Sequence, residues 1–223
     1  FAGFKFGLGS RAQKQELEVL GGPAITATMT AAPTTDVGTN GPFVNPGDTL
    51  EYTVTLNNIG QTGNGVVFTD NLTDANLTLV PGSIKATPIA FDDTYPVTGN
   101  VRISTANGAA SLLANDIRPT TGTNTGLTIT TLAGDNTAAF AGTSAQGGQV
   151  TAATGDGSFA YNPAPGFEGA DSFTYIVTDP DGLTSTGTVN ITVAGMIWFV
   201  QAGAPAGGDG RLSAPFNCLV GAG

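Results

Sequence analysis

The sequence predicts an all-β protein built from tandem Greek-key β-sandwich modules, with extra strands near both ends of the chain. Gly and Pro are abundant, with 33 and 13 residues, while charged residues make up only 11% of the chain. This composition favours short strands and turns over helices. Apolar residues make up 40%, which is enough to bury hydrophobic cores. Large residues also alternate with small or polar ones in many short segments, the pattern of strands that bury one face.

The clearest strand pattern lies in the second half of the chain. Large side chains recur at every second position in Ser158–Tyr161 and in Asp171–Thr178, so each segment is predicted to be a strand. Asp156-Gly157 and Asp179–Gly182 are typical of hairpin turns, because Asp and Gly tolerate a left-handed backbone. Proline cannot donate to a sheet ladder, so we expect Asn162–Gly166, which contains two prolines, to cross from one sheet to the other.

We expect four segments along the chain. Residues 1–21 form an N-terminal strand and linker, in which the charged stretch Arg11–Leu20 is a linker or polar edge strand, or else a short helical turn. A small sandwich follows at 22–86, and a larger one, near the usual size of roughly 100 residues, at 87–195. Residues 196–223 begin with an apolar strand, Met196–Val200. We expect this last segment to be the start of a further domain in a longer protein.

Two segments of the chain share one pattern. Asp48–Thr55 reads DTLEYTVT and Asp171–Thr178 reads DSFTYIVT, so that Tyr52 aligns with Tyr175. A tyrosine at this place is typical of the tyrosine corner of Greek-key sandwiches, in which the hydroxyl group bonds to a nearby loop. The repeat therefore predicts two modules built on one plan.

Charge and residue types exclude several classes of function. The chain carries 17 acidic and 7 basic residues, for a net charge of −10, and so lacks the basic surface that nucleic acid requires. It has no His, and Cys218 is its single cysteine. This excludes Ser-His-Asp and Cys-His catalysis, zinc sites built from His and Cys, and internal disulfides. Because the residues for these kinds of catalysis are missing, we predict a protein that is not an enzyme.

No apolar run approaches the ~20 residues of a membrane span.

Residues 86–195 contain a series of motifs in a fixed order. They are Phe91–Asp93, Leu113–Asp116, Asp156–Pro163, Gly166–Tyr175, Val177–Gly182 and Thr188–Val193. This series resembles a bacterial cadherin-like or immunoglobulin-like (Ig-like) repeat of large surface proteins. The resemblance implies tandem Ig-like/Greek-key β-sandwich modules with extra terminal strands. It also implies an extracellular or cell-surface location in a prokaryote and a role as spacer or adhesion module.

Two shorter segments carry resemblances of their own. Residues 41–84 resemble a repeat of bacterial and archaeal envelope proteins, through the motifs Pro46–Asp48, Tyr52–Asn57 and Phe68–Asp70. The last segment resembles the opening rung of the parallel β-helix of autotransporter-like adhesins, through the motifs Met196–Val200, Gly207–Arg211 and Ala214–Leu219. A solenoid of that kind needs several rungs to bury its core.

Acidic residues gather in the predicted turns and are candidate ligands for calcium, which takes six to eight oxygen atoms. The candidates are Asp92, Asp93, Asn115, Asp116, Asp179 and Asp181. In the resembled repeats such positions lie near module ends, where a cation would stiffen the junction. The alternative is that Asp and Asn are present because turns favour them. A glycosidase pair at Asp92-Asp93 is disfavoured, because neighbours on a strand point to opposite faces.

Apolar residues near the chain ends support a second class of function. Phe1–Gly9 alternates like a strand, and Met196–Val200 is apolar throughout. Either segment could add a strand to the sheet of a neighbouring copy, which would make the protein a self-assembling subunit of an extracellular filament or sheath. The side chains expected to take part are Phe4, Phe6, Leu8, Ile197, Trp198 and Phe199. In the first class, a spacer or adhesin segment, the partner would be a cell surface or a glycan.

Overall fold

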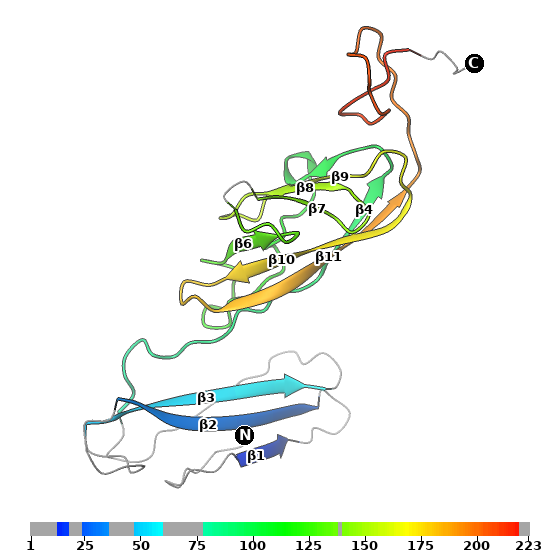
Figure 1. Ribbon diagram of the computed structural model, residues 1–223. Helices are drawn as coiled ribbons and strands as arrows, with labels where there is room; N and C mark the ends of the chain where they lie inside the picture. Colours follow the sequence, from blue (N-terminus) through cyan, green and yellow to red (C-terminus); the bar gives the residue numbers. More distant parts are fainter. Residues whose placement is uncertain (1–12, 18–23, 36–46, 60–77, 138–139, 219–223) are drawn as a thin grey trace. The chain divides into compact units, whose positions relative to one another are not determined.

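A computed structural model describes residues 13–17, 24–35, 47–59, 78–137 and 140–218. The chain divides into two compact units, Phe1–Leu79 and Val80–Gly223, so the expected boundary after residue 86 falls within the second unit. Strands dominate both units (Figure 1), which confirms the all-β prediction. Within the described ranges, no helix has the length and apolar character needed to cross a membrane.

The first unit contains a three-stranded antiparallel sheet in the order β1-β2-β3 (Figure 1). Its strands are β1 (Gln13–Leu17), β2 (Ile25–Thr35) and β3 (Thr49–Asn58). β1 pairs with β2 only from Ile25 to Met29. Pro33 lies beyond that range, so its missing N–H removes no hydrogen bond to β1. β1 lies within the charged stretch Arg11–Leu20 and is the first strand in the order β1-β2-β3, so the described part of this stretch is an edge strand and not a helical turn.

The alternating residues of β3 share one face of this sheet. Leu50 and Val54 are half-buried, whereas Tyr52 is 36% exposed and Leu56 is 47% exposed.

Much of the predicted small sandwich lies outside the described residues. This holds for residues 36–46 and 60–77. The separate expected strand Phe1–Gly9, with Phe4, Phe6 and Leu8, also lies outside the described residues. A complete sandwich at 22–86 therefore stays a prediction.

The second unit is a β-sandwich of two four-stranded sheets (Figure 1). The first sheet has the order β4-β11-β10-β6, with β4 (Asp93–Thr98), β11 (Thr184–Ala194), β10 (Gly169–Thr178) and β6 (Thr128–Leu132). The second has the order β5-β9-β8-β7, with β5 (Ile103–Ser104), β9 (Phe159–Asn162), β8 (Gln149–Ala152) and β7 (Ala141–Thr143). A 3-10 turn, η1 (Thr105–Asn107), follows β5.

The strand predictions for Ser158–Tyr161 and Asp171–Thr178 are confirmed within a residue or two. The expected strands Ser158–Tyr161 and Asp171–Thr178 correspond to β9 and β10, and these strands belong to different sheets. Asn162–Gly166 therefore does cross between the sheets. The two predicted turns close the antiparallel hairpins β8–β9 and β10–β11.

Alternate residues of the central strands fill the core between the sheets. Phe173, Tyr175 and Val177 of β10 are at most 5% exposed, and the intervening residues face outward. From the second sheet, Phe159 packs against Tyr95 of β4 with ring centroids 4.8 Å apart. The core is completed by Val97, Leu112, Leu113, Leu127, Ile129, Leu132, Phe140, Val150, Tyr161, Val189, Ile191 and Val193.

The segment Met196–Val200 does not form the predicted strand. The N–H of Phe199 donates to the carbonyl of Gly210, and the carbonyl of Phe199 accepts from Phe216, both at 2.9 Å. Val200 forms only an isolated parallel bridge to Phe216. Glycines with positive φ at 203, 207 and 210 turn the chain repeatedly, so no partner segment is long enough to build a sheet.

This C-terminal segment is bonded to loops at the end of the sandwich where β11 finishes (Figure 1). The N–H of Leu212 donates to the carbonyl of Asn100 at 2.9 Å. Arg211 donates to the carbonyl of Pro163 at 3.2 Å, and Asn162 donates to the hydroxyl of Ser213. These contacts hold residues 196–218 against the sandwich although they form no strand of it.

We expect Gly187→Ala to destabilise the second unit. Gly187 pairs directly with Tyr175, and an added Cβ would lie 2.5 Å from the tyrosine ring. Overpacking of this kind costs roughly 1–3 kcal/mol. Chemical denaturation measures the loss, and Gly155→Ala is the control because nothing lies within 4 Å of its Cβ position. Equal loss in the two variants would contradict the packing described here.

Candidate functional site

The hydroxyl group of Tyr175 lies in a buried polar cluster. It is 3.0 Å from the carbonyl oxygens of both Phe91 and Leu112 and 3.2 Å from each carboxyl oxygen of Asp116. A phenol has one proton to donate, so it serves one of these acceptors at a time, and a protonated Asp116 can donate to the phenol oxygen. The predicted bond from this tyrosine to a nearby loop is confirmed.

Two carboxyl groups share this cluster. Burial raises the pKa of Asp93 to about 6, against the hydrogen bond from Tyr175, and the nearby charge of Asp116 adds to the rise. Burial likewise raises the pKa of Asp116 to about 6, although hydrogen bonds from the Phe91 N–H and from Tyr175 oppose it. One oxygen of Asp93, Oδ2, is buried without a hydrogen-bond partner. Both groups are therefore harder to ionise than an ordinary aspartate.

A third buried carboxyl group, that of Asp171, is well satisfied. Its Oδ2 accepts hydrogen bonds from the hydroxyls of Ser144 at 2.5 Å and Tyr161 at 2.6 Å. Its Oδ1 accepts from the N–H groups of Gln146 and Ser172, both at 2.8 Å. Because Tyr161 lies on β9 and Asp171 on β10, the cluster joins the two sheets. Burial, together with the hydrogen bond to Asp171, raises the pKa of Tyr161.

Asp179 and Asp181 belong to the β10–β11 hairpin. Asp179 Oδ1 accepts from the N–H groups of Asp181 and Leu183, both at 2.9 Å, as Asp does in many turns. Arg118 pairs with Asp181 at 3.0 Å and approaches Asp179 at 4.0 Å. These two carboxylates are therefore engaged with the turn and with one arginine.

The six calcium candidates thus divide into two groups and do not form one site. Asp92 accepts from the N–H of Thr188 at 3.0 Å, and the Asn115 amide donates to the carbonyl of Asp92 at 3.3 Å. In the part of the chain that the structure describes, no three His, Cys, Asp or Glu side chains are arranged to hold a metal ion. Calcium binding stays a prediction. Two buried oxygens of this set have no hydrogen-bond partner, Asp93 Oδ2 and Asp179 Oδ2, and the second lies 4.0 Å from Nε of Arg118.

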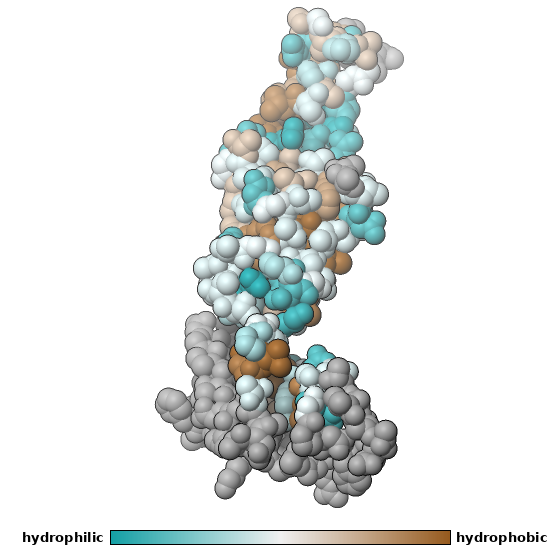
Figure 2. Space-filling model, turned by 90° about the vertical axis from the view of Figure 1, so that its left-hand side faces the viewer, coloured by the Kyte–Doolittle hydropathy of each residue, from teal (hydrophilic) through white to brown (hydrophobic). Residues whose placement is uncertain are grey.

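The assembly candidates at the C-terminal end differ in exposure. Ile197 is 46% exposed and Trp198 is 52% exposed, whereas Phe199 is half-buried. Trp198 stacks on Phe216 with ring centroids 5.8 Å apart. On the face drawn in Figure 2, hydrophobic residues of the second unit lie in small groups between polar ones. The N–H and the carbonyl of Phe199 are both bonded within the chain, so one edge of this segment is occupied, and strand addition to another copy stays a prediction.

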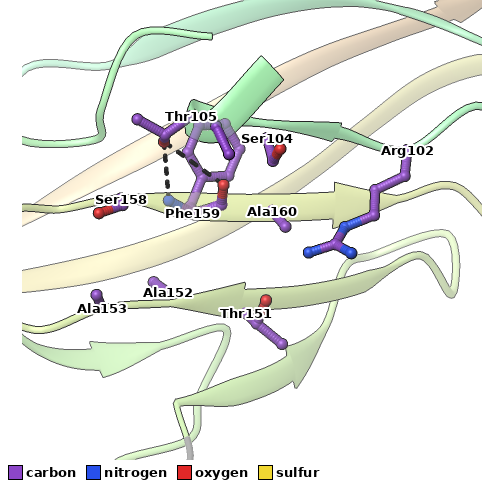
Figure 3. A pocket seen from close by; sticks show the side chains of 10 residues that line it. Arg102, Ser104, Thr105, Thr151, Ala152, Ala153, Ser158, Phe159 and Ala160 are labelled. Carbon is purple, nitrogen blue, oxygen red and sulfur yellow. Dashed lines mark hydrogen bonds between the residues drawn. The ribbon is translucent and has the colours of Figure 1, made fainter. Parts of the chain in front are cut away.

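The structure also shows a hollow that the sequence did not reveal, on the outer face of the second sheet (Figure 3). It has a volume of about 270 Å³. Its lining comes from the start of β5, from η1, and from β8 and β9. The residues are Arg102, Ser104, Thr105, Ala106, Thr151, Ala152, Ala153, Ser158, Phe159 and Ala160. In the sequence, the lining of this hollow is marked only by small residues, such as Ser104, Thr151 and Ala160, on the outward positions of the strands. A search for large apolar residues at every second position does not detect such residues.

We expect Asp93→Asn to stabilise the protein at pH 7 relative to the wild type. A carboxyl group with a raised pKa in the folded state contributes stability below its unfolded pKa of about 4, and that contribution is lost as the pH rises toward the folded pKa. For Asp93 the folded pKa is about 6. Asparagine stays neutral, so the difference in melting temperature between variant and wild type should grow from pH 4 to pH 7.

Asp92→Asn is the matched control for this measurement. Its exposed side chain accepts one N–H, which an asparagine oxygen can also accept. A difference for Asp93→Asn that stays constant across this pH range would contradict the assignment.

Comparison with known proteins agrees with this architecture. Residues 85–192 match the family model described as "Bacterial Ig domain", and no curated protein matches the chain. The matched range coincides with the Ig-like resemblance found for residues 86–195, while the envelope-protein resemblance of residues 41–84 stays a prediction. Domains of this family are typical of surface proteins, and their fold type is non-catalytic. Over residues 85–192, the sandwich formed by the second unit is therefore similar to the bacterial Ig domain family.

Proposed function

We propose that this chain is a non-enzymatic spacer segment of a bacterial surface protein, which separates other parts of that protein and carries tension along its length. The family match supports a structural module. The observation that carries the proposal is the way in which the chain enters and leaves the sandwich.

The first and last strands of the sandwich, β4 and β11, are neighbours and run parallel (Figure 1). Their register runs from Asp93 opposite Val189 to Thr98 opposite Ala194. The chain therefore enters beside one end of this strand pair and leaves at the other end. β11 has 11 residues, and at about 3.3 Å per residue it spans roughly 36 Å. A domain connected in this way adds its own length to the chain that contains it.

The same arrangement determines how the domain responds to tension. Force applied before β4 and after β11 pulls the two strands past one another, so that all the hydrogen bonds between them are strained together. Force applied at one end of the pair would instead separate the bonds one after another. A parallel pair of terminal strands therefore suits a module that is pulled from both sides.

Single-molecule pulling tests the spacer proposal. With Cys218, an exposed free cysteine, replaced by serine, attachment through Lys85→Cys and Ala194→Cys should load β4 and β11 in shear. Attachment through Lys85→Cys and Thr184→Cys pulls both strands from the same end. We expect the first geometry to require a clearly higher unfolding force, because its hydrogen bonds are strained together. Equal forces would contradict a tension-bearing role for this strand pair.

A second candidate function is a self-assembling subunit of an extracellular filament. It is favoured by the exposed apolar side chains of the C-terminal segment, which are Ile197, Trp198, Val200 and Leu212, each at least 39% exposed. Size-exclusion chromatography and negative-stain microscopy of the purified chain separate the two functions. A monodisperse monomer supports the spacer. Regular fibres that disappear with Trp198→Ser and Leu212→Ser would favour the filament.

Calcium remains part of the proposal as a stiffening ion. Asp93 and Asp116 would be its ligands, because ionisation of these buried groups is otherwise unfavourable. If calcium binds there, a chelator should lower the melting temperature and the protease resistance of the protein as purified. Unchanged values after chelation would remove calcium from the account.

A further inference from the structure

We propose that the hollow on the outer face of β5, β9 and β8 binds a sugar-acid residue of a surface polysaccharide, with Arg102 pairing its carboxylate. The inference goes beyond the spacer function and does not depend on it. It rests on three polar side chains that line the hollow and lack partners within the described residues, and on the size and floor of the hollow.

The size of the hollow limits the ligand. At about 270 Å³ it is smaller than sites for drug-sized molecules and is a shallow depression open to solvent, so it has room for no more than one small ring. Ala160 forms its floor and is only 7% exposed. On either side, Ala160 pairs with Ser104 of β5 and Thr151 of β8. Side chains of directly paired residues point to the same face of a sheet, so these three side chains face outward together.

Ser104 supplies the first observation that indicates a ligand. The residue is only 7% exposed, and its hydroxyl forms no hydrogen bond with any other described residue, not even at the start of η1. The other hydroxyls nearby are engaged. Thr105 exchanges hydrogen bonds with the backbone of Phe159, as Figure 3 shows, and Ser158 donates to Asp156. The Ser104 oxygen is not one of the fully buried atoms without a partner, so it opens into the hollow, where a ligand could bond to it in place of water.

Arg102 supplies the second observation. The side chains of Arg118 and Arg211 each pair with an aspartate, at 3.0 and 2.6 Å. Arg102 has no such partner among the described residues, although acidic residues outnumber basic ones by 17 to 7. In Figure 3 its guanidinium extends over β9 toward Thr151. A guanidinium with free N–H groups matches a carboxylate in a two-point hydrogen-bonded pair.

These features together indicate a sugar acid. A carboxylate would occupy Arg102, and ring hydroxyls would bond to Ser104 and Thr151, whose own hydroxyl also has no partner within the described residues. A neutral sugar would leave the guanidinium unpaired. The net charge of −10 repels anions at long range, but salt screens this repulsion beyond about 8 Å at physiological ionic strength. Recognition therefore depends on contacts inside the hollow.

The test is a titration of the whole chain with D-galacturonic acid and, in parallel, with D-galactose, followed by ligand-observed NMR. The two sugars differ at a single carbon, which is a carboxylate in the acid. We expect a Kd of about 1 mM for the acid and at least about tenfold weaker binding of galactose, because the charge-assisted pair is lost. Arg102→Gln should weaken binding of the acid by about tenfold.

Matched variants separate the hollow from general effects. Lys85→Gln removes the same charge from an exposed residue outside the hollow and should leave binding unchanged. Thr151→Val should weaken binding, whereas Thr186→Val, at an exposed position on the other sheet, should not. Ala160→Val fills the floor without changing charge and should also weaken binding. Melting curves confirm that each variant is folded.

Several results would overturn the proposal. One is that galacturonic acid does not bind to the folded wild type. Another is that galacturonic acid and galactose bind equally tightly. A third is that Arg102→Gln and Lys85→Gln weaken the binding of galacturonic acid by the same factor. Acetate that binds as tightly as galacturonic acid would show a simple anion site and would also overturn it. None of these outcomes bears on the pulling experiment, so the spacer function stands or fails separately.

Discussion

The hydrogen bonds of the Tyr175 hydroxyl are the constraint on which the rest of the sandwich depends. The phenol ring fills the centre of the core at 0% exposure, and its oxygen reaches the loops at Phe91 and Leu112. Neighbouring positions are adapted to the ring. The residue paired with it is Gly187, whose missing side chain leaves room for it. The loop at Leu112 is thereby held where Leu112 and Leu113 enter the core.

The buried carboxyl groups show two ways of placing an acid in a core. Asp171 has four donors around it, so its burial is matched by hydrogen bonds. Asp93 has a buried oxygen with no partner, and burial raises its pKa to about 6. The first arrangement joins the sheets at little electrostatic cost. The second makes stability depend on pH at the end of the sandwich where the chain enters.

Sequence periodicity predicted the strands that bury one face, because alternation of large and small residues directly reflects burial. β10 and β11 were found for this reason, and the prolines placed the crossover between sheets. Periodicity does not report which strands are neighbours, so the parallel pairing of β4 and β11 had to come from the structure. It also misled at Met196–Val200, where apolar residues contact Gly210 and Phe216 in a series of turns.

The candidate site was the least predictable part. The acidic residues of the turns were visible in the sequence, but their division between a buried pair and an arginine-bound hairpin depends on the fold. Tyr52 and Tyr175 stand in the same eight-residue pattern, yet the first is 36% exposed and the second fully buried, because a pattern does not report what packs on a strand. The hollow beside Arg102 was missed since alanine and serine carry no periodic signal.

A double-mutant cycle between Tyr175→Phe and Asp116→Asn tests the central claim most directly. Unfolding of the wild type, the two single variants and the double variant would be followed by chemical denaturation at pH 7. The account predicts that Tyr175→Phe costs roughly 1–3 kcal/mol, since a buried acceptor loses its donor. It also predicts a coupling energy of about 0.5–3 kcal/mol between the two residues. A loss below about 0.5 kcal/mol, with additive effects, would show that the sandwich does not depend on this hydroxyl group.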